Sequence, residues 1–79
     1  CEIDIVARKD NTIYFVEVKY RSNGYQGSGF DYITDAKQTQ MARAAESWVQ
    51  AHGWEGDYQL SAIQLSGAGF RIDSFLETL

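Results

Sequence analysis

Alternation of apolar and polar residues predicts two strands near the start of the chain. Residues 2–7 (EIDIVA) alternate between acidic and apolar positions, and residues 12–20 (TIYFVEVKY) form a longer, mostly apolar run. Residues 8–11 between them are polar and turn-forming, which predicts a hairpin. Both faces of the second segment are largely apolar, so we expect this strand to be central in its sheet and covered on both sides.

A helix is the clearest prediction in the middle of the chain, where Thr34 or Asp35 can cap its start. Asp35 and Gln38 match the capping-box spacing in a weakened form, and Gly53 follows as a stop signal. Between these signals runs an apolar stripe at helical spacing, which consists of Met41, Ala44, Ala45, Trp48 and Val49. The stripe predicts an amphipathic helix that lies against a sheet.

Two further strands are predicted over residues 57–65 and 70–76, the second of them at the edge of the sheet. The predicted fold class is therefore α/β: a single domain over residues 1–79, with a mixed β-sheet of about four strands and one long helix on one face. No segment of the chain is a candidate for covering the other face. We expect a helix there from an N-terminal portion that precedes these residues, or from a partner chain.

The stretch between the second strand and the helix has no clear period. Residues 21–33 contain three glycines and three aromatic residues, which predicts a loop next to the end of the central strand. Two interpretations of Tyr25 and Phe30 stay open. Their side chains either clamp a substrate or fold back onto the core.

Composition is that of a small globular domain. Hydrophobic residues make up 44% and aromatic residues 14% of the 79 positions, which argues against disorder. No apolar run approaches the roughly 20 residues that cross a bilayer, so no membrane partner is expected. Cys1 is the only cysteine, which excludes an internal disulfide and makes the cytoplasm the simplest compartment.

The net charge of −4 weighs against a nucleic-acid-binding surface, because affinity for phosphates usually comes from basic residues. Carboxylates that hold a metal ion would contribute to this acidity, and a bound divalent ion would offset them. The charge of an N-terminal portion is unknown. Net charge therefore lowers the case for a nuclease only slightly.

Charged residues inside apolar strands are the candidate chemistry of the chain. Glu17 and Lys19 are two residues apart and share one strand face, and Glu2 and Asp4 repeat this spacing in the preceding strand. Buried charges are costly unless a function uses them, so we interpret this set as a divalent-metal site for phosphodiester hydrolysis. The structural alternative is an ion pair between Glu17 and Lys19 at a sheet edge, with Glu2 and Asp4 facing solvent.

The polar residues of the helix divide between its two sides. Gln38 lies one turn before Met41 on the inward side, so its amide is expected to reach the strand face. Lys37 and Arg43 are expected to point elsewhere, either toward phosphates or into solvent. His52, the only histidine, lies near the end of the helix, where a cation is favoured, and we assign it no chemistry.

Three stretches together carry a family resemblance: EID at 2–4, FVEVKYRS at 15–22 and ITDAKQ at 33–38. They resemble the signature of the YraN-type (UPF0102), Holliday-junction-resolvase-like family, which belongs to the PD-(D/E)XK nuclease superfamily with the restriction-endonuclease-like fold. The likeness covers nearly the whole chain. It departs at Cys1, where the family normally has glycine, and in an upstream helix with a glutamate, which these residues do not include.

The resemblance implies a restriction-endonuclease-like core, without its N-terminal helix in these residues, in which Asp4 and Glu17 hold Mg²⁺ or Mn²⁺. Glu2 is a further candidate ligand or a support for the strand. Lys19 would orient the attacking water or stabilise the developing charge, and Gln38 would lie beside the metal site. The residues assigned to DNA contact are Arg21, Ser22, Lys37 and Arg43.

The resulting hypothesis is a metal-dependent DNA endonuclease that acts on branched or structured DNA. One alternative is a catalytically inactive nucleic-acid-binding domain with the nuclease fold. Another is a protein-interaction module whose acidic strand face binds a basic partner. Resolution of a DNA junction needs two cuts related by symmetry, so a homodimer is expected if that is the substrate.

Overall fold

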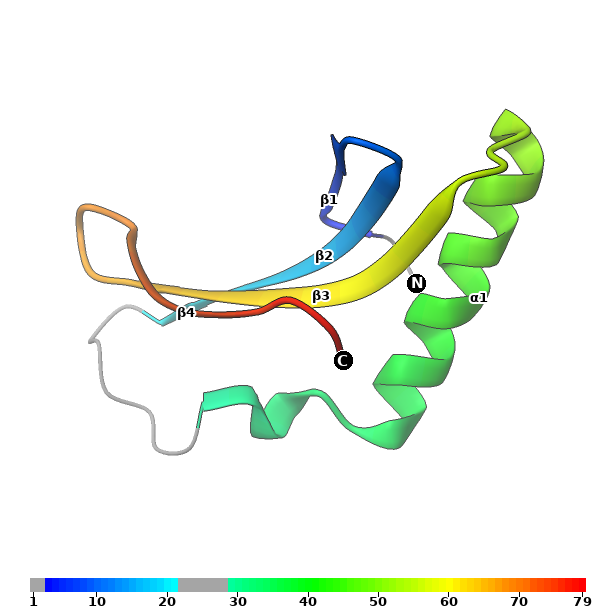
Figure 1. The fold of residues 1–79 in the computed structure, drawn as a ribbon. Helices are drawn as coiled ribbons and strands as arrows, with labels where there is room; N and C mark the ends of the chain where they lie inside the picture. Colours follow the sequence, from blue (N-terminus) through cyan, green and yellow to red (C-terminus); the bar gives the residue numbers. More distant parts are fainter. Residues whose placement is uncertain (1–2, 22–28) are drawn as a thin grey trace.

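A mixed four-stranded sheet and one long helix make up the computed structural model, which describes residues 3–21 and 29–79 (Figure 1). In chain order the elements are β1 (Ile5–Lys9), β2 (Thr12–Arg21), the short 3₁₀-helix η1 (Gly29–Tyr32), α1 (Asp35–His52), β3 (Asp57–Ser66) and β4 (Arg71–Leu76). The sheet order is β1-β2-β3-β4, with β2 and β3 parallel and both outer pairs antiparallel. The predicted fold class, α/β with a mixed sheet and one long helix, is confirmed.

The N-terminal hairpin is tighter than its sequence pattern predicts. β1 spans Ile5–Lys9, so it begins after Asp4 and continues into the segment predicted as a turn. Asp10 and Asn11 alone form the turn, and Asp10 has a φ of 55°, a left-handed conformation that aspartate tolerates. All the residues of β1 are exposed, so the polar side chains at its end do not oppose strand pairing.

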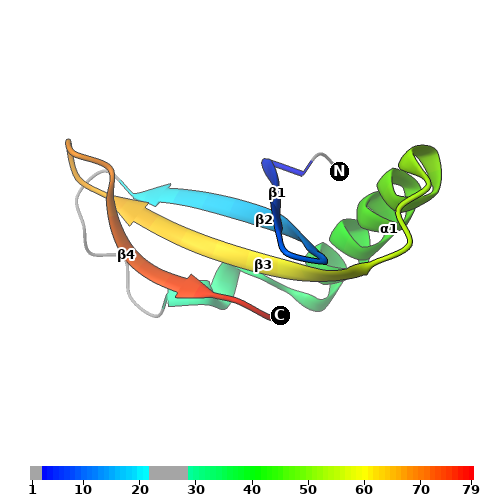
Figure 2. The same ribbon diagram turned by 45° about the horizontal axis from the view of Figure 1, so that its top comes forward.

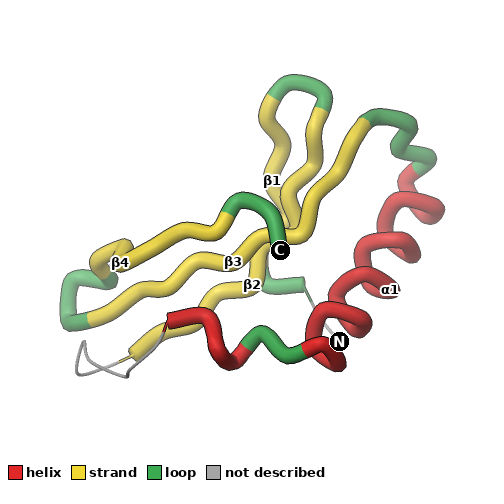
Figure 3. Tube along the Cα trace, turned by 60° about the horizontal axis from the view of Figure 1, so that its bottom comes forward, coloured by secondary structure: helices red, strands yellow, loops and turns green. Residues whose placement is uncertain are grey.

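The central parallel pair, β2 and β3, is in register along its whole length, with residues 12–21 beside residues 57–66. Parallel neighbours need a crossover connection, and α1 supplies it by lying across one face of the sheet (Figure 1 and Figure 3). The Asp57 N–H donates a hydrogen bond to the Asn11 carbonyl oxygen at 2.9 Å. This bond ties the start of β3 to the turn of the hairpin.

Both ends of α1 are fixed by signals that the sequence carries. Thr34, one of the two predicted caps, is the N-cap, and its Oγ1 accepts a hydrogen bond from the Lys37 N–H at 3.1 Å. Gly53 closes the helix in the left-handed conformation, with a φ of 62°, as predicted. Neither α1 nor any other helix in the described part of the chain is long and apolar enough to cross a membrane.

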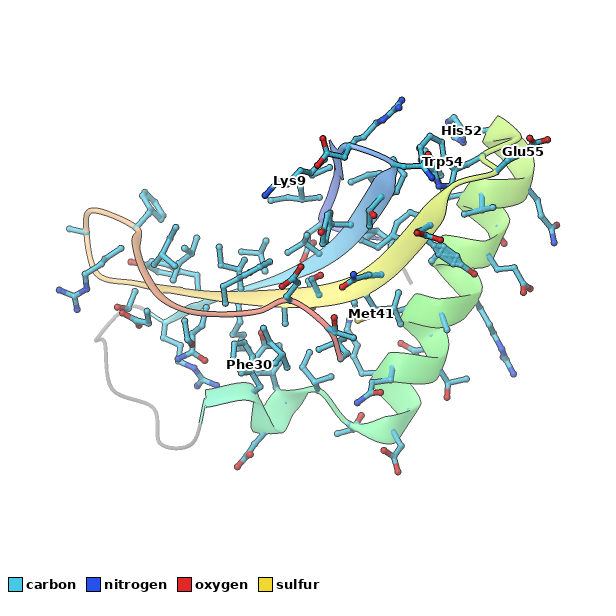
Figure 4. The ribbon with its side chains drawn as sticks, in the orientation of Figure 1. Lys9, Phe30, Met41, His52, Trp54 and Glu55 are labelled. Carbon is cyan, nitrogen blue, oxygen red and sulfur yellow. The ribbon has the colours of Figure 1, made fainter. Side chains whose placement is uncertain are left out.

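The core lies between α1 and the first half of β2. Phe15 is fully buried, and its ring meets that of Trp48 edge-on, with the centroids 5.5 Å apart. Ile13 and Ala45 belong to the same buried cluster, and Met41 is buried one turn before Ala45, on the side of α1 that faces the sheet (Figure 4). The apolar stripe predicted for the helix therefore forms its inward face.

The opposite face of the sheet, which Figure 2 turns toward the viewer, carries no helix from the described residues. On this face Ile5, Ile72 and Phe75 are 46%, 62% and 52% exposed. Val16 and Ile63 line a groove of about 440 Å³ there with Ile5 and Phe75. The central position of β2 is confirmed, but within the described residues it is covered on one face only. A helical cover from outside these residues remains a prediction.

Two phenylalanines that face opposite sides of the sheet give a matched test of this core. Phe15→Ala removes a buried ring and leaves a cavity, so we expect it to lower the free energy of unfolding by about 3–5 kcal/mol. Phe75→Ala removes an exposed ring, and we expect a loss of less than about 1 kcal/mol. Urea unfolding followed by circular dichroism measures both values. Equal losses would contradict the assignment of the core to the α1 side.

Candidate functional site

The second half of β2 carries the candidate residues on the face that α1 and η1 cover. Glu17, Lys19 and Arg21 follow Phe15 at every second position, so they continue its row on this face. Their partners in β3 are Ala62, Gln64 and Ser66. Because these partners are uncharged, β3 adds no charge that competes for the residues of β2. In Figure 1, η1 lies below this part of the sheet.

Asp4 lies directly before β1 rather than within a strand, yet it reaches β2. Its Oδ2 accepts a hydrogen bond from the Val18 N–H at 2.8 Å. Ile5, the next residue, pairs with Val16, so Asp4 lies beside the part of β2 that contains Glu17. Asp4 is exposed, as in the structural alternative, but its carboxylate is also held by the backbone of β2. The structure brings the two predicted carboxylates to neighbouring positions and fixes one of them through the backbone.

Glu17 forms an ion pair with Lys37 of α1. The Lys37 Nζ lies 3.3 Å from Oε2 of Glu17, whose side chain is only 15% exposed. The alternative in which Glu17 pairs with Lys19 is therefore wrong. So is the expectation that Lys37 points away from the strand face, because the first turn of α1 stands over the Glu17 end of β2. Contact of Lys37 with DNA remains a prediction.

Lys19 lies against an aromatic ring. Its Nζ is 5.5 Å from the centroid of Tyr32, and the Arg21 guanidinium carbon is 5.9 Å from the same centroid. Tyr32 ends η1, two residues before the cap of α1, so the start of the helix fixes its position. Tyr32 is not predicted from the sequence, although the three aromatic residues of the loop were a signal for it.

The hydroxyl of Tyr32 is buried and has no hydrogen-bond partner among the residues that the structure describes. Burial raises the pKa of this phenol above its usual value of 10.0. The carboxylate of Glu17 raises this pKa further, the Arg21 guanidinium lowers it, and Asp4 raises it. The ring therefore stands in the field of both carboxylates, and its hydroxyl is neutral at physiological pH.

Asp4 and Glu17 supply the carboxylate oxygens that Mg²⁺ prefers, and this ion commonly uses one or two carboxylates together with waters and substrate phosphates. No group of three or more His, Cys, Asp or Glu side chains comes together within residues 3–21 and 29–79. Glu2, the third predicted ligand, lies outside the described residues. The donors present fit an ion that also meets a substrate, and the ammonium of Lys37 would compete with that ion for Glu17.

The other two candidate residues of α1 lie in different surroundings. Gln38 is half-buried in the first turn, beside Lys37, and its contact with a metal site remains a prediction. Arg43 is exposed and lines an open hollow with Gln40, Ala44 and Ser47. Because this hollow contains none of the β2 candidates, the structure does not bring Arg43 to the same site.

Two predicted residues of the loop, Ser22 and Tyr25, lie outside the described residues, so both interpretations of Tyr25 stay open. Phe30 is half-buried, and its ring centroid is 6.3 Å from that of Tyr32. His52 lies at the end of α1, near Trp54 and Glu55 (Figure 4). Its ring stacks on Trp48 with the centroids 4.0 Å apart, and its Nδ1 lies 2.9 Å from the Trp48 carbonyl oxygen.

Comparison with known proteins gives a single family. The model of a family described as "Uncharacterised protein family UPF0102" matches residues 1–75. A UPF0102 protein of Vibrio parahaemolyticus is 36% identical over 74 residues, which are 91% of this chain and 61% of the relative. A UPF0102 protein of Nitrosomonas europaea is 43% identical over 68 residues, 84% of this chain and 56% of the relative. One from Chlorobium chlorochromatii is 40% identical over 77 residues, 94% of this chain and 60% of the relative. The chain thus spans about three-fifths of the length of these relatives.

The raised pKa of Tyr32 predicts a loss of stability at alkaline pH. A phenol whose pKa is higher in the folded state gives stability that is fully present below pH 10.0 and is lost as the pH rises through the folded-state pKa. We expect the urea midpoint of Tyr32→Phe, relative to its own value at pH 7, to fall less between pH 9 and pH 11 than that of the wild type. Tyr14→Phe should act in the same direction, since burial and Glu77 raise the pKa of Tyr14. If the urea midpoint of Tyr32→Phe falls as much between pH 9 and pH 11 as that of the wild type, this explanation is contradicted.

Proposed function

The chain belongs to the uncharacterised protein family UPF0102, and we propose that it forms the core of a divalent-metal-dependent DNA endonuclease of the PD-(D/E)XK superfamily. The proposed reaction is hydrolysis of phosphodiester bonds in branched or structured DNA. One observation carries the proposal: the Asp4 carboxylate accepts a hydrogen bond from the N–H of Val18, the residue between Glu17 and Lys19 on β2. Two carboxylates and an ammonium in this arrangement suit a cation, a water and a phosphate.

Asp4 and Glu17 are the proposed ligands of Mg²⁺ or Mn²⁺. When bound, such an ion supplies Lewis-acid stabilisation of a phosphate and lowers the pKa of a coordinated water. Lys19 would donate hydrogen bonds to the attacking water or to the phosphate, where its charge offsets the charge that develops. Lys37 neutralises Glu17 and adds a second cation at the same place. Gln38 is proposed to lie beside the metal site.

The proposed partner is DNA, with Arg21, Ser22, Lys37 and Arg43 as its contacts. Cutting both strands of a junction symmetrically would call for a homodimer. The presence of one cysteine supports a cytoplasmic setting. Because the chain spans about three-fifths of its relatives, the activity of the whole protein is part of this proposal.

A second candidate function is a catalytically inactive nucleic-acid-binding domain. Two observations favour it. No third His, Cys, Asp or Glu joins Asp4 and Glu17 within the described ranges, and Glu17 already has the Lys37 ammonium as its partner. Such a domain would contact phosphates through its lysines and arginines without holding a metal ion.

Metal binding is the first test of the proposed function. Titration of the ¹⁵N-labelled chain with Mg²⁺ should shift the amide signals of Asp4, Glu17 and Val18, with saturation in the millimolar range, because the ion would coordinate the two carboxylates. Glu17→Gln removes one charge of the site and should abolish the shifts, whereas Glu46→Gln, at an exposed position of α1, should preserve them. The proposed metal-dependent function would be contradicted if millimolar Mg²⁺ or Mn²⁺ caused no shift of any amide signal.

Cleavage of a four-way DNA junction separates the two candidate functions. For an endonuclease we expect Lys19→Ala to lower the cleavage rate by roughly 10²–10⁴-fold, the usual contribution of a group that transfers or stabilises a proton in the transition state. Lys9→Ala, on exposed β1, is the matched control and should leave the rate unchanged. Binding without cleavage, unaffected by Lys19→Ala, would instead support the inactive domain.

A further inference from the structure

The charge of Lys19 meets a ring rather than a carboxylate. Within residues 3–21 and 29–79 no ion pair involves Lys19, and its Nζ lies 5.5 Å from the centroid of Tyr32. Glu17, two residues before it on the same face, is instead paired with Lys37 at 3.3 Å. Something therefore keeps these two opposite charges of β2 apart.

We propose that Tyr32 is a positioning residue, whose ring holds the Lys19 ammonium away from Glu17 and so keeps that charge available for a phosphate. The inference rests on the proposed function, which gives Lys19 its task. It adds Tyr32 to the proposed site, a residue that is not among the carboxylates and the lysine predicted on the strands.

The ring is suited to this task because its hydroxyl end is enclosed and its backbone is fixed. Its hydroxyl is buried, so the ring is inserted toward the sheet and does not swing in solvent. Its backbone ends η1, where the Ile33 N–H donates to the Phe30 carbonyl oxygen at 2.9 Å, just before Thr34 caps α1. The face of the ring is thereby presented to β2 in a fixed position.

A lysine needs such a support here because its four-carbon stem is flexible and its ammonium is a compact charge. Glu17 and Lys19 project from the same face at a spacing that their side chains can bridge. If Lys19 closed on Glu17, it would neutralise a proposed metal ligand and lose its own charge for substrate. An aromatic face attracts the ammonium without neutralising it, because the attraction comes from the ring quadrupole.

Three variants test the ring apart from the hydroxyl. Tyr32→Phe keeps the ring, Tyr32→Leu removes it, and Lys19→Met removes the charge. The first readout needs no ligand: the ε-methylene protons of Lys19 should be shifted upfield by the ring in the wild type and in Tyr32→Phe, and should return toward random-coil values in Tyr32→Leu. Circular dichroism checks that each variant is folded. A Lys19 shift that Tyr32→Leu leaves unchanged would overturn the placement.

The second readout is the salt dependence of binding to a fluorescein-labelled four-way DNA junction in EDTA. A lysine that meets a phosphate contributes about one unit to the slope of log affinity against log salt. We expect Lys19→Met and Tyr32→Leu each to reduce the slope by about one and to weaken binding several-fold, with no further loss in the double variant. Tyr32→Phe and the control Lys9→Met should keep the slope of the wild type.

The outcomes separate this inference from the proposed function. If Lys19→Met leaves the slope unchanged, Lys19 meets no phosphate, and both the proposed role of Lys19 and the inference fall. If Lys19→Met reduces the slope but Tyr32→Leu does not, Tyr32 has no positioning role, although the proposed function stands. If Tyr32→Phe and Tyr32→Leu reduce the salt slope by the same amount, the effect comes from the hydroxyl rather than from the ring, and the inference is again overturned.

Discussion

The parallel pairing of β2 with β3 is the constraint on which the rest of the structure depends. A parallel neighbour cannot follow directly by a hairpin, so the chain must return from the end of β2 to the start of β3. The helix α1 makes this return across one face of the sheet. Its first turn consequently stands near the second half of β2, which brings Lys37 to Glu17, and η1 comes to lie against Lys19 and Arg21.

The same geometry gives each charge of the site a different partner. Asp4 accepts from a backbone N–H, Glu17 meets an ammonium of the helix, and Lys19 meets a ring. Glu17 and Lys19 are half-buried, and charged groups that leave water need such compensation, because an uncompensated buried charge is costly. The partners come from three separate parts of the chain: β2 itself, α1 and η1. Glu17 and Lys19 therefore lie close together on this face without forming an ion pair with each other.

Features that depend on local sequence were predictable from it. The apolar run of β2, the cap at Thr34 and the left-handed stop at Gly53 each follow from residues within a few positions, and the structure has them where they were predicted. The limits of β1 were not predictable, because an exposed edge strand accepts polar residues that resemble a turn. The ion pair of Lys37 with Glu17 and the place of Tyr32 were missed for another reason. Their roles depend on how α1 and η1 lie over β2, which side-chain periodicity along one element does not specify.

The uncovered face of the sheet has a thermodynamic consequence. Ile5, Ile63 and Phe75 form an apolar surface that exists only when the strands are paired, so any molecule or segment that covers it binds the folded chain and not the unfolded one. By mass action such binding adds to the free energy of unfolding as the logarithm of the concentration of the covering species. The stability of these four strands is thus not a fixed property of the 79 residues. It varies with what is present in solution around them.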